Sequence, residues 1–588
     1  MTDNVLTHKV TLREFFSFFT RILAPEASYY QLAVIYGIGI GILSLATPIS
    51  VQMLINTVAN TGLTTPLVVL SVTLFVLLLM ASGLNALRIH LMDLFARRFY
   101  ARMVSEISLR SIYALNPFFH DYNMGALFNR YFDIIIVQKT LPNLLVGGFT
   151  ILLQAVVGFI LVSMYHPLFL AFNLVMIALI WIIWIVWGRR AIISAIDLSH
   201  RKHATAAWLE GLGMSNGFYK SERHIGEAIR RSDAVTREYI DQHALHFRHH
   251  FAQILCFLFL YAAASAVLLG LGGWLVIQGQ LTLGQLVAAE LVLSVVFVGI
   301  SQMGIYMAYF YELCGAIDEL SLFLRVEQEE PDDTYVSPEG DSTLEFVNAR
   351  GDARGTMATM NFSIPSGARV LGAAELHGVQ RELTSFLKRH EPPEGGIVTL
   401  GGLDIRGVRA HQLRQEIIVL DRPNAIEMTV REYLALTRDD VEASAVMEVL
   451  RLVGLEAAVT QLEDGLDTRI ASTGWPLTIT ETMQLKLAAA MIATPKVLIL
   501  SELYDTIGDL HLKRSLDWLQ KQSETTILYF SGRNRNIGFT HYLFLGQREQ
   551  KLLGSFEDLY RSCMDVMDYV ALDPLPGQSD TTSGGSKT

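Results

Sequence analysis

The sequence predicts an all-α membrane domain of six transmembrane helices with long cytoplasmic extensions, followed by a soluble α/β domain. The first observation is composition: 51% of the 588 residues are hydrophobic and 18% are charged, with a mean hydropathy of +0.35. The second is placement, because the apolar residues fill the first half of the chain. The third is a change of pattern near residue 340, where short β runs begin to alternate with amphipathic helices. A disordered chain and an ordinary soluble enzyme are both excluded.

The six spans follow from three long stretches that contain almost no charged residue. A helical crossing takes about 20 predominantly apolar residues, so each stretch is long enough for two. A short polar interruption divides each of them, at Asn60–Pro66, Tyr165–Pro167 and Gln278–Gly284. None of these three connections contains Lys or Arg, whereas basic residues gather between 88 and 139 and between 189 and 248. Because positive loops stay in the cytoplasm, we expect a multi-pass inner-membrane protein with both termini cytoplasmic.

The two long connections have apolar residues at helical spacing, which predicts that the transmembrane helices continue tens of ångströms beyond the bilayer. The turns are expected at Asn116–Gly125 and Gly211–Tyr219. Ahead of the first span, an apolar stripe from Leu12 to Leu23 suits a helix lying in the inner interface, and an ordinary packed helix is the alternative.

Glu290 is the one ionisable residue well inside a predicted span, roughly 12 Å along the helix from Thr282. A carboxylate in lipid is expensive and commonly contacts a proton or a substrate, which makes Glu290 a candidate for the substrate path. The alternative, equally open from the sequence, is that Glu290 faces an aqueous cavity or a neighbouring hydroxyl and carries no function.

The net charge of −11 and the pI near 5.8 argue against a nucleic-acid partner, which would require a basic face. In the soluble half, a strand at Ala368–Leu371 is followed by the segment Gly372–Gln380 and then a helix, the place that a phosphate-binding loop would take. A Gly/Ser/Thr-rich tail follows Leu572, and we expect it to be disordered.

Several further segments occur in a characteristic order along nearly the whole chain. They are Asn116–Gly125 with Arg130 and Asp133, Gly279–Val287, Glu391–Gly395, Leu413-Arg414, Gly465–Thr468 and Gly554–Leu559. In this order the chain resembles ATP-binding-cassette (ABC) exporters of the type I fold, in the half-transporter arrangement of six membrane helices and one P-loop-type ABC nucleotide-binding domain. The resemblance implies an N-terminal amphipathic helix (1–27), a transmembrane domain (28–325), a linker (326–340), a nucleotide-binding domain (341–572) and a tail (573–588). It also implies a dimer in which coupling helices press onto paired cassettes.

The phosphate loop departs from the family pattern GxxxxGK[ST]. Gly378 matches the second glycine, but Ala373 replaces the first and Val379 replaces the lysine that reaches the β- and γ-phosphates. Gln380 and Arg381 stand in place of the hydroxyl pair that binds Mg²⁺. The loop has therefore lost its charge and its metal ligand.

The other nucleotide-site motifs depart as well. The family's LSGGQ signature reads Leu477–Glu481 here, where Thr478 replaces Ser, and Ile479 and Thr480 replace the glycines that admit a phosphate. Ser501 replaces the Mg²⁺-binding Asp of the Walker B strand, while Glu502 matches the water-activating glutamate. Asp421 aligns with the Mg²⁺-sensing glutamine and Gly532 with the switch histidine. The resemblance implies ATP and Mg²⁺ as cofactors, and these departures argue against both.

Two functions remain open from the sequence. The first is a subunit of an ABC-exporter-type inner-membrane transporter whose own cassette does not hydrolyse ATP, working in the lipid bilayer as a homodimer or as a heterodimer with another half-transporter. The alternative is a non-transporting scaffold or regulatory pseudo-ABC protein, assembled with a periplasmic adaptor protein or other inner-membrane partners. An apolar cavity in the membrane domain suits lipids, peptides and hydrophobic compounds alike.

Overall fold

The computed structural model describes residues 12–55, 64–115, 124–329, 340–353, 356–438, 442–533 and 537–564. The chain divides into two compact units, Met1–Glu329 and Glu330–Thr588. The first unit is helical, and the second contains the β-sheets.

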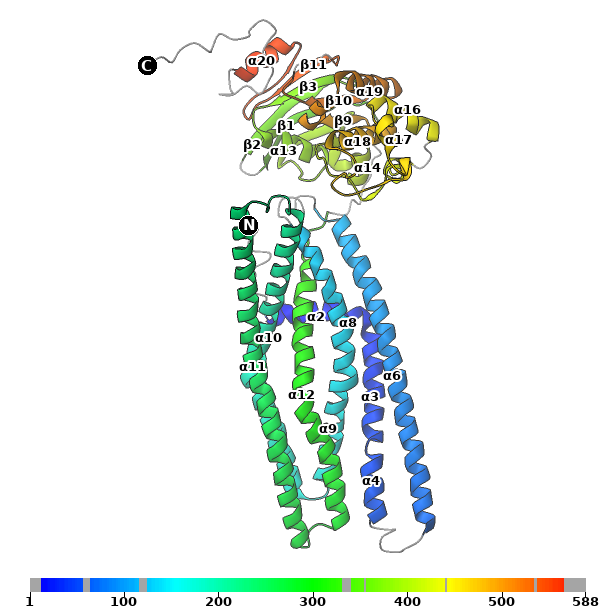
Figure 1. The fold of residues 1–588 in the computed structure, drawn as a ribbon, viewed down its shortest axis with the longest axis vertical. Helices are drawn as coiled ribbons and strands as arrows, with labels where there is room; N and C mark the ends of the chain where they lie inside the picture. The colour runs from blue at the N-terminus through cyan, green and yellow to red at the C-terminus, as the bar shows by residue number, and fades with distance from the viewer. Residues whose placement is uncertain are drawn as a thin grey trace, which may run out of the picture. The chain divides into compact units, whose positions relative to one another are not determined.

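Long helices dominate the first unit and run side by side (Figure 1). In chain order the described helical elements are α2 (Leu12–Leu23), η1 (Ala24–Glu26), α3 (Ala27–Leu43), α4 (Ala46–Met53), α6 (Thr64–Ile112), η3 (Met124–Phe132), α8 (Asp133–Asn143), η4 (Leu144–Gly148), α9 (Phe149–Ser163), α10 (Pro167–Met214), α11 (Glu222–Ile277) and α12 (Leu283–Leu324). They form six spans that are long and apolar enough to cross a membrane, which confirms the predicted fold class.

The connections lie where the sequence predicts them, as far as they are described. α9 ends at Ser163 and α10 begins at Pro167, after His166 caps its first turn. Thr282 and Gln285 form a capping box at the start of α12, in the predicted turn at Gln278–Gly284. The predicted turns at Asn60–Pro66 and Asn116–Gly125 fall largely on residues 56–63 and 116–123, which lie outside the described residues.

Four of the helices are much longer than a bilayer crossing requires. α6, α10, α11 and α12 contain 49, 48, 56 and 42 residues. At about 1.5 Å per residue they are roughly 63 to 84 Å long, against a hydrocarbon thickness of about 30 Å. Each helix therefore continues tens of ångströms past the membrane, as the sequence predicts. α2 lies across the direction of these helices (Figure 1), and its Ile22 and Leu23 are buried in the core of the unit.

A π-helical turn, η4, joins α8 to α9 and faces a buried arginine. Arg88 on α6 is 2% exposed and donates to Thr150 Oγ1 at 2.6 Å and to the carbonyl oxygen of Val146 at 3.0 Å. Gly147 in this turn has no room for a side chain, because a Cβ atom would lie 2.4 Å from the ring of Tyr306. Close packing and a buried cation thus fix the geometry of the turn.

The second unit is built on two main sheets. The described strands are β1 (Leu344–Ala353), β2 (Thr356–Ile364), β3 (Arg369–Ala374), β4 (Gly395–Leu400), β5 (Leu403–Asp404), β6 (Ile417–Leu420), β7 (Met428–Thr429), β8 (Arg469–Ile470), β9 (Val497–Leu500), β10 (Thr526–Phe530), β11 (His541–Leu545) and β12 (Gln550–Leu553). One sheet is antiparallel, in the order β2-β1-β4-β5, and the other is mainly parallel, in the order β12-β11-β3-β10-β9-β6. β9 and β10 are buried along their whole length, as expected for central parallel strands.

Helices accompany both sheets and divide the hydrophobic interior into two main cores. The described helices are α13 (His377–Leu387), η5 (Ile405–Gly407), α14 (Ala410–Glu416), α15 (Val430–Ala435), α16 (Ala443–Val453), α17 (Glu456–Gln461), η6 (Gly465–Asp467), α18 (Ile479–Ala493), η7 (Glu502–Thr506), α19 (Asp509–Gln522) and α20 (Phe556–Met564). One core joins α13 to the two sheets, and the other joins α16, α18 and α19 to the parallel sheet. Both cores border the parallel sheet, because alternating residues of β9 and β10 belong to one core and to the other.

Candidate nucleotide site

The carboxyl edge of the parallel sheet gathers most of the predicted site residues. β3, β10, β9 and β6 run parallel to one another, so the residues that follow them share one edge. Asp421 follows β6, Ser501 and Glu502 follow β9, and Gly532 lies just after β10. Ligands of open parallel sheets bind at such an edge. The topology thus agrees with the predicted place of the site.

The phosphate-loop segment differs from the prediction. The sequence predicts a strand that ends at Leu371 and a loop from Gly372 to Gln380, but β3 continues to Ala374 and α13 already begins at His377. Gly372, Ala373 and Ala374 pair with residues of β11, and Glu375 N–H still donates to the Leu545 carbonyl at 2.9 Å. The reason is that pairing with β11 holds these residues in the sheet. Only two residues are left between strand and helix.

Val379, at the position of the family's lysine, belongs to the hydrophobic core. Its exposure is 0%, and it packs in the core that also contains Leu383 and Phe386. Gly378 and Gln380 are half-buried on the same helix, and Arg381 is exposed. The side chain at position 379 therefore points toward the sheet and away from any ligand beyond the helix end.

Glu375 adds a negative charge beside this segment. Its Oε2 accepts a hydrogen bond of 2.8 Å from the Gln547 N–H. The N-cap of α13 is Leu376, whose side chain makes no capping bond. The first N–H groups of α13 can therefore still bind an anion, as at other helix N-termini. The nearby Glu375 carboxylate, however, would repel a polyphosphate.

The two residues at the Walker B positions, Ser501 and Glu502, differ in burial. Ser501 is 9% exposed, and its Oγ has no hydrogen-bond partner among the described residues. Glu502 is exposed at the start of η7. A serine hydroxyl is a poor substitute for a carboxylate as an Mg²⁺ ligand. Within the described ranges no cluster of three His, Cys, Asp or Glu residues could hold a metal ion.

A carboxylate that the sequence analysis missed lies beside Gly532. Asp505 on η7 accepts hydrogen bonds from Tyr529, and from Ser531 at 2.8 and 3.0 Å. Ser531 Oγ in turn accepts from the Arg533 N–H at 3.0 Å. This network fixes the turn after β10 without a histidine. Its partners come from separate elements, so no local pattern in the sequence identifies it.

Asp421 lies among basic side chains. Burial lowers the pKa of Lys388 and of Lys486, and the Asp421 carboxylate partly offsets that effect. Lys486 Nζ donates to the carbonyl oxygens of Arg422 at 2.6 Å and Asn424 at 3.0 Å. The segment after β6 is therefore tied to α18 by a lysine, in a region where the family has a glutamine.

The segment Leu477–Glu481, at the position of the family's signature, caps the start of its own helix, α18. Thr478 is the N-cap of α18 and forms a capping box with Glu481: the Thr478 N–H donates to Glu481 Oε2 at 2.7 Å, and the Glu481 N–H donates to Thr478 Oγ1 at 3.3 Å. Ile479 and Trp475 are 63% and 73% exposed at the same end. The Thr-x-x-Glu spacing is a signal for such a box that could have been recognised in the sequence. A carboxylate and bulky side chains now occupy the place where glycines would admit a phosphate.

These residues do not fit Mg·ATP in the manner of the family. The position of the lysine is in the core, the Mg²⁺ ligand is replaced by a serine, and the Glu481 carboxylate is bonded to the Thr478 amide at the start of the signature helix. We therefore derive no catalytic step through a bound nucleotide.

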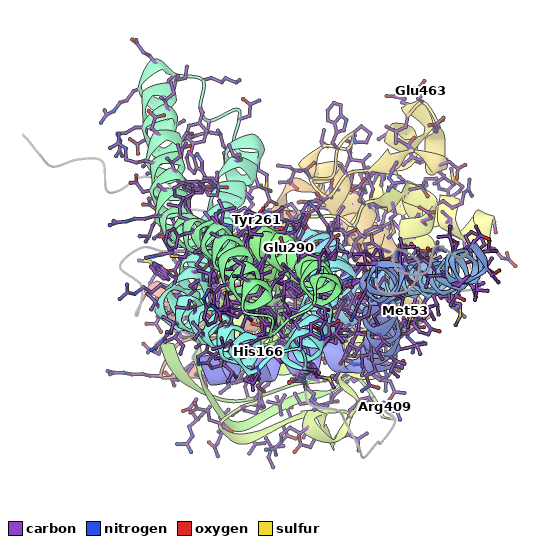
Figure 2. The ribbon with its side chains drawn as sticks, turned by 90° about the horizontal axis from the view of Figure 1, so that it is seen from below. Met53, His166, Tyr261, Glu290, Arg409 and Glu463 are labelled. Atoms are coloured by element: carbon purple, nitrogen blue, oxygen red, sulfur yellow. The ribbon has the colours of Figure 1, made fainter. Side chains whose placement is uncertain are left out.

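In the membrane unit, Glu290 lies on α12 (Figure 2). It is half-buried, and its Oε2 is buried without a hydrogen-bond partner among the described residues. One alternative from the sequence is that a neighbouring hydroxyl contacts Glu290. The structure shows no such contact to Oε2 among the described residues.

Comparison with known proteins defines the class. No protein-family model matches the chain. The fold is similar to a solved structure of a bacterial Atm1-family ABC exporter with ATP bound, with a TM-score of 0.75 over 92% of this chain and 97% of that one, at 16% identity. The chain therefore has the fold of ABC exporters in the half-transporter arrangement, with six apolar helical spans followed by one sheet-containing domain.

Particular relatives agree with this class. The chain is 24% identical over 579 residues to the ABC multidrug transporter mdr2 of Aspergillus fumigatus, a match that covers 92% of this chain and 70% of that protein. It is 27% identical over 240 residues to the leukotoxin translocation ATP-binding protein LktB of Mannheimia glucosida, covering 40% of this chain and 34% of the relative. The alpha-hemolysin translocation ATP-binding protein HlyB of Escherichia coli O157:H7 matches similarly, at 24% identity over 41% of this chain. The chain spans about a third of the length of these two toxin translocation proteins, 34% and 35%.

Proposed function

We propose that this chain is a transport subunit of the inner membrane whose cassette does not hydrolyse ATP by itself. It works as a dimer with another half-transporter, which supplies the ATP turnover. The class of protein supports a dimeric membrane transporter. The surroundings of Val379 and Thr478 support the inactive cassette.

The observation that carries the proposal is the burial of Val379. In this family, a composite site joins the phosphate loop of one chain to the signature of the other. With Val379 in the core, the first of these lacks the cation that the family's lysine supplies to the phosphates. With Thr478 and Glu481 forming a capping box on α18, two amides of the second are already bonded and a carboxylate lies at the helix end. Because removing one preorganised donor already costs about 10²–10³ in rate, a homodimer of this chain would have no competent half-site.

The distribution of basic residues supports the orientation. The connections between α9 and α10 and between α11 and α12 contain no Lys or Arg, whereas the far ends of α6, α10 and α11 carry many. These far ends and both termini are then cytoplasmic. The scaffold hypothesis predicts the same orientation. Only an experiment distinguishes it from the transport hypothesis.

The test is ATP hydrolysis by the purified full-length chain in lipid nanodiscs, alone and together with a consensus half-transporter from the same source. We expect no vanadate-sensitive turnover from the chain alone, and turnover from the pair. Glu502→Gln in this chain should leave the turnover of the pair unchanged, and the corresponding substitution in the partner should abolish it. Vanadate-sensitive turnover by the chain alone that Glu502→Gln removes would overturn the proposal. Absence of stimulated turnover and of pairing would favour the scaffold.

A further inference from the structure

α12 has an exposed face that differs from the rest of the membrane unit. It is the most enclosed of the six spans: 50% of its most apolar window is buried, against 22% or less for the others. Its polar residues Glu290, Ser294, Ser301 and Gln302 nevertheless fall within about 120° of the helix circumference, at 100° per residue. The exposed side chains of Val298 and Ile305 lie on the same face.

This mixed face is unlike a lipid-facing surface. The corresponding window of α6 is 0% buried, and its outward side chains are apolar, among them Val68, Val72 and Phe75. A carboxylate and an amide facing hydrocarbon would be costly, so intramembrane groups of this kind face a bundle interior or a water-filled path. We therefore take the exposed face of α12 as the lining of such a path.

Glu290 is also unlike the other buried carboxylates of the unit. Glu26 is paired with Arg102 at 2.7 Å, Asp133 with Lys202 at 2.7 Å, and Glu319 with Arg130 at 2.5 Å. By contrast, Glu290 forms no ion pair within the described part of the chain, and its buried Oε2 has no hydrogen-bond partner there. A charged group left without a partner gains most from a cation brought by a ligand.

The side chains near Glu290 on this face indicate which chemical groups a ligand would need besides a positive charge. Ser294 and Ser301 donate their hydroxyl protons to carbonyl oxygens of their own helix, at 3.1 and 2.7 Å, so their oxygen lone pairs remain as acceptors. The exposed side chains of Val298 and Ile305 add branched apolar surface to the same face. One negative charge on an otherwise weakly polar and apolar surface suits a ligand with a delocalised positive charge and an apolar body.

We propose that Glu290 is the counter-ion of a lipophilic cation bound along the exposed face of α12. This inference rests on the proposed transport function and gives it a substrate class, organic cations with an apolar body. Neutral and anionic compounds of the same shape are disfavoured by the same carboxylate.

The test uses two probes of nearly identical shape and opposite charge, tetraphenylphosphonium and tetraphenylborate. Binding of each to the full-length chain in nanodiscs of neutral lipid is measured by equilibrium dialysis, for the wild type, Glu290→Gln and Glu290→Asp. Glu312→Gln is the matched control, because it removes the same charge from an exposed position of the same helix that lies about 33 Å from Glu290 along the axis. A fluorescence melt of each variant shows whether it is folded.

We expect Glu290→Gln to weaken phosphonium binding by about tenfold or more, Glu290→Asp to retain part of it, and Glu312→Gln to leave it unchanged. The borate should bind no better to the wild type than to Glu290→Gln. Equal phosphonium binding by folded wild type and Glu290→Gln would overturn the inference. If binding depends on Glu290 but the reconstituted pair exports no phosphonium, the cation site stands and the transport function fails.

Discussion

The carboxylate of Asp133, which has no exposed surface, lies 2.7 Å from the ammonium group of Lys202. The two residues belong to α8 and α10, and the neighbouring His203 binds the other carboxylate oxygen at 2.5 Å. A second pair, Arg130 with Glu319, joins η3 to α12. Ion pairs with fully buried carboxylates thus connect four helical elements of the membrane unit, α8 with α10 and η3 with α12.

Removal of the Asp133 charge should destabilise this part of the unit. Asp133→Asn leaves Lys202 and His203 beside a neutral amide, and breaking a buried pair from one side costs about 3 kcal/mol. We expect a clear fall in the apparent melting temperature of the full-length chain in nanodiscs, followed by tryptophan fluorescence. Glu238→Gln is the control, since it removes the exposed partner of Arg201, a neighbour of Lys202 on α10, and should cost less than about 1 kcal/mol. Equal shifts for both variants would show that burial of Asp133 contributes nothing.

Restoring the family's lysine should harm the protein without restoring nucleotide binding. Val379→Lys places an ammonium group in a core position of 0% exposure, which we expect to cost about 3 kcal/mol or more. Gln380→Ser on the same helix is half-buried and should cost less than about 1 kcal/mol. Thermal melts and binding of a fluorescent ATP analogue measure the two effects. A Val379→Lys variant with a wild-type melt and a gain in Mg·ATP affinity would contradict the core position.

The capping box of α18 should contribute to stability and not to ligand binding. Thr478→Ala removes the oxygen that accepts the Glu481 N–H, a loss of about 1 kcal/mol. Thr429→Ala, in the equivalent box of α15, should cost a similar amount and is the matched control. We expect the melts to fall together while the amount of bound nucleotide stays unchanged. A selective change in nucleotide binding by Thr478→Ala would point instead to a surviving signature function.

His390 should make stability depend on pH. Burial, with the positive charges of Arg414, Lys388 and Arg422, lowers the pKa of His390 to about 3. In the unfolded chain the same group titrates near its ordinary value of about 6.5. Between these values only the unfolded chain takes up the proton, so the stabilisation is complete above about pH 6.5 and is lost as the pH falls toward 3.

The expected slope is up to about 1 kcal/mol per pH unit below pH 6.5. Melts of the wild type and His390→Gln between pH 7.5 and 5.0 isolate this contribution, since all other groups are common to both. The wild type should lose stability faster on acidification. Parallel pH profiles would show that folding does not lower the pKa of His390.

The sequence was sufficient for features that depend on local pattern. Charge-free stretches predicted the six spans, and polar interruptions predicted the turns at Tyr165–Pro167 and Gln278–Gly284. The extension of β3 to Ala374 was not predictable in this way, because it depends on pairing with β11, about 170 positions further along the chain. The partners of Asp133 and Asp505 are likewise brought together only by the fold. The capping box of Thr478 and Glu481 was predictable, because its Thr-x-x-Glu spacing is local. It was not predicted, because the comparison with the family pattern considered only the missing glycines.

The short link between β3 and α13 has a consequence for how the protein responds to its surroundings. A ligand that binds only the folded state stabilises it in proportion to its concentration. Under the proposed function, in which this two-residue link holds no nucleotide, the domain would unfold at the same temperature whether cellular ATP is high or low. Its abundance would then follow synthesis and assembly with its membrane partner, independently of the adenylate pool.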